Sequence, residues 1–230
     1  MRRWFFVVLS VVLSGYAPFA LASDLLASTG RLERTDSNGT CSATLISPDV
    51  VVTAAHCVNV ENTFEHEFPR LFYRPAAPGF VSPVAVVEGI HHPLYAPARD
   101  DMRWRFPFDL AVLRLARALP ERANPVLSLG PPPVHGETLT LVTWRRRPEA
   151  PLVRPCPVLP GPASVVTLGC SVSSGESGGA VVRKTETGAE IVAVLTSRSR
   201  VGDLEIAQAS HLDGRVAPML RRLDAEKEGG

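Results

Sequence analysis

Three short segments of the chain contain residues that could together hydrolyse a carbonyl compound. His56 is the fourth residue of T-A-A-H-C, Asp109 opens the apolar run D-L-A-V-L-R-L, and Ser177 is the central residue of G-E-S-G-G. A serine hydroxyl attacks a carbonyl when a neighbouring base takes its proton, and a histidine whose tautomer is fixed by a carboxylate is such a base near neutral pH. Ser177, His56 and Asp109 are therefore the candidate nucleophile, base and orienting acid.

Each segment is weak evidence when it is taken alone. A lone histidine beside an apolar strand is usually structural, and glycine and serine are common in turns. Asp109 is more informative, because a carboxylate at the start of a buried strand is costly unless its charge is paired or hydrogen-bonded. Asp100 and Asp101 lie in a polar, arginine-rich stretch and are interpreted as solvated loop charges.

The three segments, in the order His, Asp, Ser, resemble the trypsin/chymotrypsin family of serine proteases. That family carries T-A-A-H-C around its catalytic histidine, a D-[IL]-A-type run around its aspartate and G-D-S-G-G around its serine. The resemblance implies a catalytic triad of His56, Asp109 and Ser177, with the division of roles known from this family. It also implies that the N–H groups of Gly175 and Ser177 form the oxyanion hole.

Two departures from the family pattern concern activation and specificity. Glu176 stands where enzymes activated by cleavage carry Asp to pair with the new N-terminus, and residues 28–32 contain no I-V-G-G-like tetrad. Three interpretations stay open: the enzyme is competent as exported, Glu176 reaches a different cation, or its longer side chain displaces the loop and weakens the oxyanion hole.

The resemblance assigns substrate binding to Ser171, Thr196 and Arg198. Ser171 stands where enzymes selective for Lys and Arg carry Asp, so we expect small or apolar P1 residues rather than basic ones. Arg198 would narrow the pocket or attract an acidic side chain.

Short β-rich runs separated by Pro and Gly clusters surround these segments. They predict an all-β sandwich or barrel. The expected strands are 40–47, 50–55, 84–90, 110–115, 138–144, 164–168, 180–183 and 190–197, with connectors at 74–79, 130–133 and 155–162. The resemblance implies two six-stranded antiparallel β-barrels, about 28–118 and 119–222, and a short C-terminal helix is expected from about 214 to 223.

The composition is that of an ordinary globular protein. Of 230 residues, 45% are hydrophobic and 20% charged, and a net charge of +1 gives no general attraction to nucleic acid. The basic cluster Arg145 to Arg147 is short and is interpreted as an exposed loop. Residues 1–22 have the charged, apolar and small-x-small parts of a signal peptide, so the mature chain is expected to begin near Ser23.

Export gives the four cysteines a structural interpretation, because disulfides persist in the periplasm and outside the cell. Four cysteines permit three pairings, and local spacing favours Cys41 with Cys57 and Cys156 with Cys170. Each short loop would constrain the unfolded chain by about 3 kcal/mol. The sequence has no C-x-x-C and no H-E-x-x-H, so no metal or cofactor is expected.

The favoured function is a secreted or periplasmic serine endopeptidase, with a protein or peptide as its substrate. We expect a monomer that binds neither nucleic acid nor, after signal cleavage, a membrane. One rival is an α/β-hydrolase esterase, since G-E-S-G-G also fits G-x-S-x-G and Ser177, Asp203 and His211 occur in the required order. A second is a pseudoprotease that only binds partners, for which Glu176 and Arg198 are the arguments.

Overall fold

A computed structural model describes residues 25–35, 39–58, 70–77, 82–95, 105–145 and 150–228. The expected signal peptide at 1–22 lies outside these residues, as do Asp100, Asp101 and the arginines at 146 and 147. No helix within the described ranges is long and apolar enough to cross a membrane.

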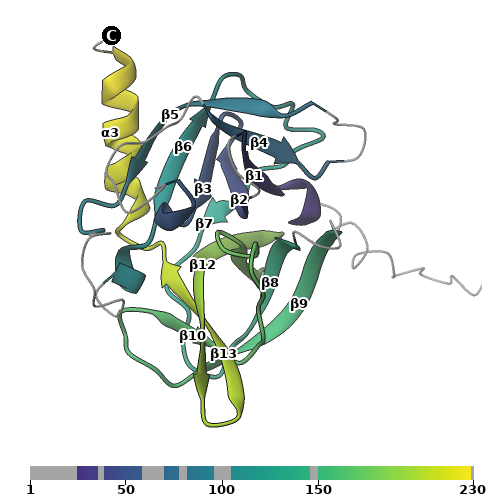
Figure 1. The fold of residues 1–230 in the computed structure, drawn as a ribbon, viewed down its shortest axis with the longest axis vertical. Helices are drawn as coiled ribbons and strands as arrows, with labels where there is room; N and C mark the ends of the chain where they lie inside the picture. The colour runs from purple at the N-terminus through teal and green to yellow at the C-terminus, as the bar shows by residue number, and fades with distance from the viewer. Residues whose placement is uncertain are drawn as a thin grey trace, which may run out of the picture.

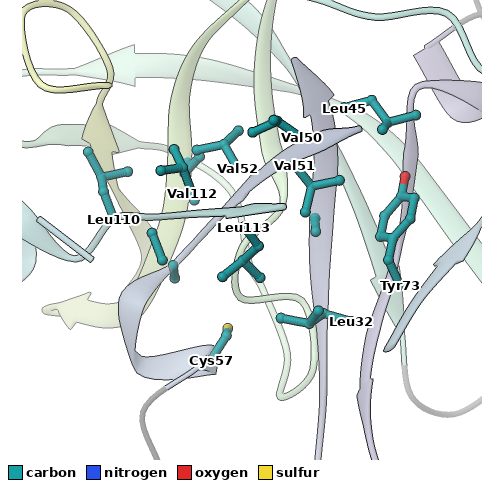
Figure 2. Close-up of a cluster of buried hydrophobic side chains, with 14 of the residues drawn as sticks. Leu32, Leu45, Val50, Val51, Val52, Cys57, Tyr73, Leu110, Val112 and Leu113 are labelled. Carbon is teal, nitrogen blue, oxygen red and sulfur yellow. The ribbon is translucent and has the colours of Figure 1, made fainter. Parts of the chain in front are cut away.

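Six strands form the first closed barrel, in the order β1-β2-β3-β6-β5-β4. Every neighbouring pair is antiparallel. The strands are β1 (Thr29–Arg34), β2 (Thr40–Ser47), β3 (Val50–Thr53), β4 (Leu71–Pro75), β5 (Val84–His91) and β6 (Ala111–Leu115). Figure 2 shows Leu32, Leu45, Val51, Tyr73 and Leu113 gathered in its buried core. Because β3 and β6 are buried along their whole length, they provide a rigid base for residues at their ends.

The second barrel closes when β11 and β12 pair at the two ends of the order β11-β8-β9-β10-β13-β12. A short parallel strand, β7, pairs with Glu190 and Ile191 near the start of β12. The strands are β7 (Ser128–Leu129), β8 (Thr138–Arg145), β9 (Ala150–Leu159), β10 (Val166–Leu168), β11 (Ala180–Lys184), β12 (Ala189–Val201) and β13 (Leu204–His211). The expectation of two six-stranded antiparallel barrels is confirmed.

A helix, α3 (Val216–Glu228), follows the second barrel but packs on the first, against β5 and β6 (Figure 1). The Arg114 guanidinium on β6 donates to Asp224 at 2.8 Å and to the Leu223 carbonyl at 3.3 Å. The helix therefore joins the two barrels. A short C-terminal helix was expected from the sequence, but it begins and ends later in the chain than expected.

Five observed strands were not among the expected ones: β1, β4, β7, β9 and β13. Of these, β9 contradicts an explicit interpretation. The cluster 155–162 was interpreted as a connector because of its prolines, but residues 150–159 form a strand. Pro151, Pro155 and Pro157 lie two or four residues apart and so face the same edge. The Pro157 carbonyl accepts from Gly169 on the β10 side, whereas the Val158 N–H donates to Glu137 on the other side. The missing N–H groups therefore point away from β8, and its pairing with β9 remains intact.

Both expected disulfides are present. Cys41 on β2 bonds to Cys57, and Cys156 on β9 bonds to Cys170 just after β10. The first joins two neighbouring segments of the first barrel, and the second closes the loop that precedes Ser171 in the second. The pairing that local spacing favoured is thus confirmed.

Candidate active site

His56 and Asp109 meet because β3 and β6 are antiparallel neighbours. Thr53 at the end of β3 pairs with Ala111 at the start of β6, so the residues just beyond them lie together. His56 stands in the 3-10 turn η1 (Ala55–Cys57), and Asp109 ends the turn η3 (Phe106–Phe108). Two hydrogen bonds join them: the His56 backbone N–H donates to Asp109 Oδ1 at 2.9 Å, and Nδ1 lies 2.6 Å from Oδ2.

The two side chains differ in exposure, as expected of a base that must reach a substrate and a buried acid that orients it. The Asp109 side chain is 5% exposed, whereas that of His56 is 38% exposed. Burial lowers the pKa of His56, but the charge and hydrogen bond of Asp109 outweigh it and raise that pKa above 6.5. With a proton held on Nδ1 by the carboxylate, the neutral ring has Nε2 available as a proton acceptor.

The loop that carries Ser177 is bound to both barrels. Its Ser177 carbonyl accepts from the Ser42 N–H on β2 at 2.7 Å, and the Gly178 N–H donates to Leu195 O on β12 at 2.8 Å. Gly178 has φ +80°, and a Cβ there would lie 2.0 Å from the Ser42 carbonyl oxygen. Only glycine allows this close approach of the loop to β2.

A short path of bonds connects the Ser177 loop to His56. Ser42 follows Cys41, which is bonded to Cys57, the residue after His56. Within the part of the chain that the structure describes, no hydrogen bond joins the Ser177 hydroxyl to His56, and Nε2 lies 3.8 Å from Cys57 Sγ. Hydrogen bonds of this kind are often loose without substrate and tighten in the complex.

Two backbone N–H groups in the loop are available to a substrate oxygen. Gly175 has φ +92°, a conformation that favours glycine. Among the described residues, neither the Gly175 N–H nor the Ser177 N–H donates to a protein acceptor, whereas the Glu176 N–H between them donates to Ser173 O. This is the donor pattern that an oxyanion hole requires.

Glu176 reaches a different cation, one of the three interpretations left open by the sequence. Its carboxylate is fully buried and pairs with Arg145 on β8 and Arg154 on β9. The interpretation of Arg145 as part of an exposed loop was therefore wrong: it is the last residue of β8 and faces Glu176. Arg154 was not identified from sequence, since nothing local distinguishes it from other strand arginines.

Of the three expected specificity residues, Thr196 and Arg198 lie on β12, and Ser171 lies in the segment between β10 and β11. Thr196 is buried, and its hydroxyl donates to Gln208 O at 3.0 Å. Ser171 is exposed and hydrogen-bonds to Glu205, a residue that the sequence did not single out. This hydrogen bond, with Arg200, lowers the pKa of Glu205.

A cavity of about 400 Å³ lies beside these residues. Its lining residues are Val172, Arg198, Ser199, Arg200, Glu205 and Ile206. With two arginines and one glutamate, the cavity wall has a net positive charge. An acid does come close to Ser171, but it is ion-paired to Arg200 at 3.3 Å.

Cys41, His56 and Cys57 place possible metal-ligand atoms close together, but their chemistry does not fit a metal site. The sulfurs of Cys41 and Cys57 lie within 4.8 Å of a His56 ring nitrogen. Both sulfurs are in the disulfide, so neither offers the thiolate that metals bind.

Comparison with known families decides the relationship of the chain. The family model described as a trypsin-like peptidase domain matches residues 41–194, more than half of the sequence and the part that contains His56, Asp109 and Ser177. The chain belongs to the trypsin-like peptidases. Its membership makes it a protease-type hydrolase that acts on proteins or peptides. A search of curated proteins found none that matches it.

The fold of this trypsin-like peptidase argues against the esterase interpretation. An α/β-hydrolase needs a sheet with helical crossovers, but Ser177 here lies between two antiparallel barrels. Asp203 directly precedes β13, and His211 is the last residue of that strand. About eight residues of extended chain lie between them and span roughly 27 Å. These two residues are too far apart to act on one another.

Proposed function

We propose that this trypsin-like peptidase is a serine endopeptidase with Ser177 as nucleophile, His56 as general base and Asp109 as the residue that orients His56. His56 Nε2 takes the hydroxyl proton while Ser177 Oγ attacks the scissile carbonyl. The N–H groups of Gly175 and Ser177 stabilise the resulting oxyanion. The imidazolium then gives its proton to the leaving amine, and water hydrolyses the acyl-enzyme under the same base.

The observation that carries this proposal is the doubly hydrogen-bonded His56–Asp109 pair beside the Ser177 loop. A pseudoprotease would need no buried carboxylate on Nδ1 and no pair of unused N–H groups around position 176. Glu176, which argued for a displaced loop, has its charge fully compensated by its partners. The active enzyme is therefore the better interpretation.

Labelling with a fluorophosphonate tests the proposal directly. The phosphonate bonds to a serine that is activated by a base and faces an oxyanion hole, so peptide mass spectrometry is expected to find the adduct on Ser177. Protein without adduct that also fails to cleave unfolded protein substrates would support the pseudoprotease instead. An adduct on another serine would contradict the assignment of the nucleophile.

The two disulfides also support a location outside the cytosol. We propose that the protein is secreted or periplasmic and that residues 1–22 act as a cleaved signal peptide. N-terminal sequencing of the exported protein is expected to show a mature chain that begins near Ser23.

The pKa of His56 gives the pH dependence of the reaction. Only the neutral imidazole accepts the serine proton, so kcat/KM is expected to rise with pH through one ionisation with its midpoint above 6.5. Steady-state kinetics on a peptide substrate between acid and mildly alkaline pH measures this midpoint. A midpoint below 6.5 would contradict the dominance of Asp109 over burial at this histidine.

The positive cavity predicts which residues are cleaved poorly. Arg198 and Arg200 outnumber Glu205, so we expect weak cleavage after Lys and Arg in a P1 peptide library. Replacing the exposed Arg198 by Ser is expected to lower cleavage after Glu relative to Ala by about 2- to 5-fold, the range of an exposed ion pair.

Arg221, exposed on α3, provides the control: Arg221→Ser should leave the Glu-to-Ala ratio unchanged. A wild-type preference for Lys or Arg would show that the cavity beside Ser171 does not bind P1.

A further inference from the structure

The buried carboxylate of Glu176 is held by three hydrogen-bond donors and by an ion pair with a second arginine. Thr143 Oγ1 donates to Oε2 at 3.0 Å, while Arg145 Nε and the Ser173 N–H donate to Oε1 at 3.1 and 3.2 Å. The Arg154 guanidinium contacts Oε2 from the neighbouring strand. We call Glu176 with Thr143, Arg145, Arg154 and Ser173 the Glu176 clamp.

Burial makes this compensation necessary. Glu176 is 0% exposed, and a fully buried carboxylate without partners would destabilise the folded protein. The two arginines lie on paired strands, since Arg154 is opposite Leu141 and Arg145 is opposite Ala150 in the β8–β9 register. The pairing of β8 with β9 therefore fixes the positions of both cations relative to each other.

The clamp constrains the backbone on both sides of the nucleophile. The Glu176 side chain accepts from the Ser173 N–H, its own N–H donates to Ser173 O at 3.2 Å, and the Gly179 N–H donates to Glu176 O at 3.1 Å. Gly175 and Ser177, which carry the unused N–H groups, are the immediate neighbours of Glu176. A shift of the Glu176 side chain would therefore rotate the peptide groups that form the oxyanion hole.

In related enzymes activated by cleavage, the acid at this position pairs with a newly made N-terminus. In this chain the cations are internal. We propose that Arg145 and Arg154 are positioning residues that replace that N-terminal amine, hold the loop 173–178 in its working conformation and make the enzyme competent without proteolytic activation. This inference rests on the proposed serine peptidase activity.

Loss of the cations is expected to lower turnover more than substrate binding. Arg154→Ala and Arg145→Met should each reduce kcat about 10- to 100-fold, somewhat less than removal of an oxyanion donor, with KM nearly unchanged. The rate of fluorophosphonate labelling should fall in the same proportion. Because Arg154 lies partly at the surface, millimolar ethylguanidinium is expected to restore part of the Arg154→Ala activity.

Arg183 is the matched control. Its side chain is 22% exposed, as is that of Arg154, and it forms an ion pair with Glu137 on the same barrel without touching Glu176. Arg183→Ala should keep wild-type kcat and labelling rate. Thermal unfolding of all variants reports folding, and Arg145→Lys, which keeps the charge, provides a milder change if Arg145→Met does not fold.

A second, independent test of the inference uses the N-terminus. Protein that retains a blocked N-terminal extension is expected to have the same kcat as protein from which the extension has been removed. Activity that appears only after removal would overturn the inference, as would Arg154→Ala and Arg145→Met variants that match Arg183→Ala. Wild-type protein without labelling or peptidase activity would instead overturn the proposed function itself.

Discussion

Ser177→Ala is expected to lower kcat on a peptide substrate by about 10⁶-fold, and His56→Ala by a similar factor. The hydroxyl and the imidazole act as one unit, because the attack on the carbonyl needs both the oxygen and a base to take its proton. The double variant should therefore be no slower than either single variant. Binding and the oxyanion hole are expected to leave a residual rate about 10³- to 10⁴-fold above that in water.

Ser174, exposed in the same loop, is the matched control for Ser177. Ser174→Ala should keep wild-type kcat, and circular dichroism should be alike for all variants. If the fold-losses of kcat in the two single variants multiply in the double variant, the two residues act independently. That result would contradict the proposed proton transfer from Ser177 to His56. An active Ser177→Ala variant would move the nucleophile elsewhere.

The family and the fold class could be predicted from the sequence because the relevant signals are local. T-A-A-H-C must present a histidine at the end of a buried strand, and Gly178 is needed where a Cβ would meet Ser42 O. Because few other residues satisfy these positions, the signals that identify the family stand in short blocks of sequence. Short β-rich runs bounded by turn residues were likewise sufficient to locate strands such as β2 and β11.

Features that depend on contacts between distant strands could not be predicted. Arg145 and Arg154 meet Glu176 only because β8 and β9 pair in one register, and Arg145 had been assigned to an exposed loop. Glu205 reaches Ser171 from a strand that was not expected. In both cases the partner lies more than 20 residues away, and the intervening sequence gives no indication of the register.

The prolines of β9 illustrate a related limit. Proline removes an N–H and normally argues against a strand. Whether the loss matters depends on which edge each N–H would face, and this is fixed by the parity of positions relative to β8. Pro151, Pro155 and Pro157 all face the β10 side, where only the end of β9 is paired.

The matched control for replacing Asp109 by Asn is the same replacement at Asp203. Asp203 lies exposed at the tip of the β12–β13 hairpin and is the acid that the esterase interpretation would require. Asp203→Asn should keep wild-type kcat and pH dependence. Loss of activity in Asp203→Asn with full activity in Asp109→Asn would reverse the assignment of the acid.

Asp109→Asn is expected to lower kcat by about 10⁴-fold while the protein remains folded. The His56 backbone N–H donates to Oδ1, so an asparagine must place its carbonyl oxygen there and its NH₂ group against Nδ1. Nδ1 then becomes an acceptor, and the ring proton moves to Nε2, which can no longer take the proton of Ser177. Loss of the carboxylate charge also removes what raises the pKa of His56, so the midpoint of the remaining activity should shift to lower pH. Steady-state kinetics across pH measures both effects, and a variant with wild-type kcat would show that Asp109 does not set the tautomer of the catalytic base.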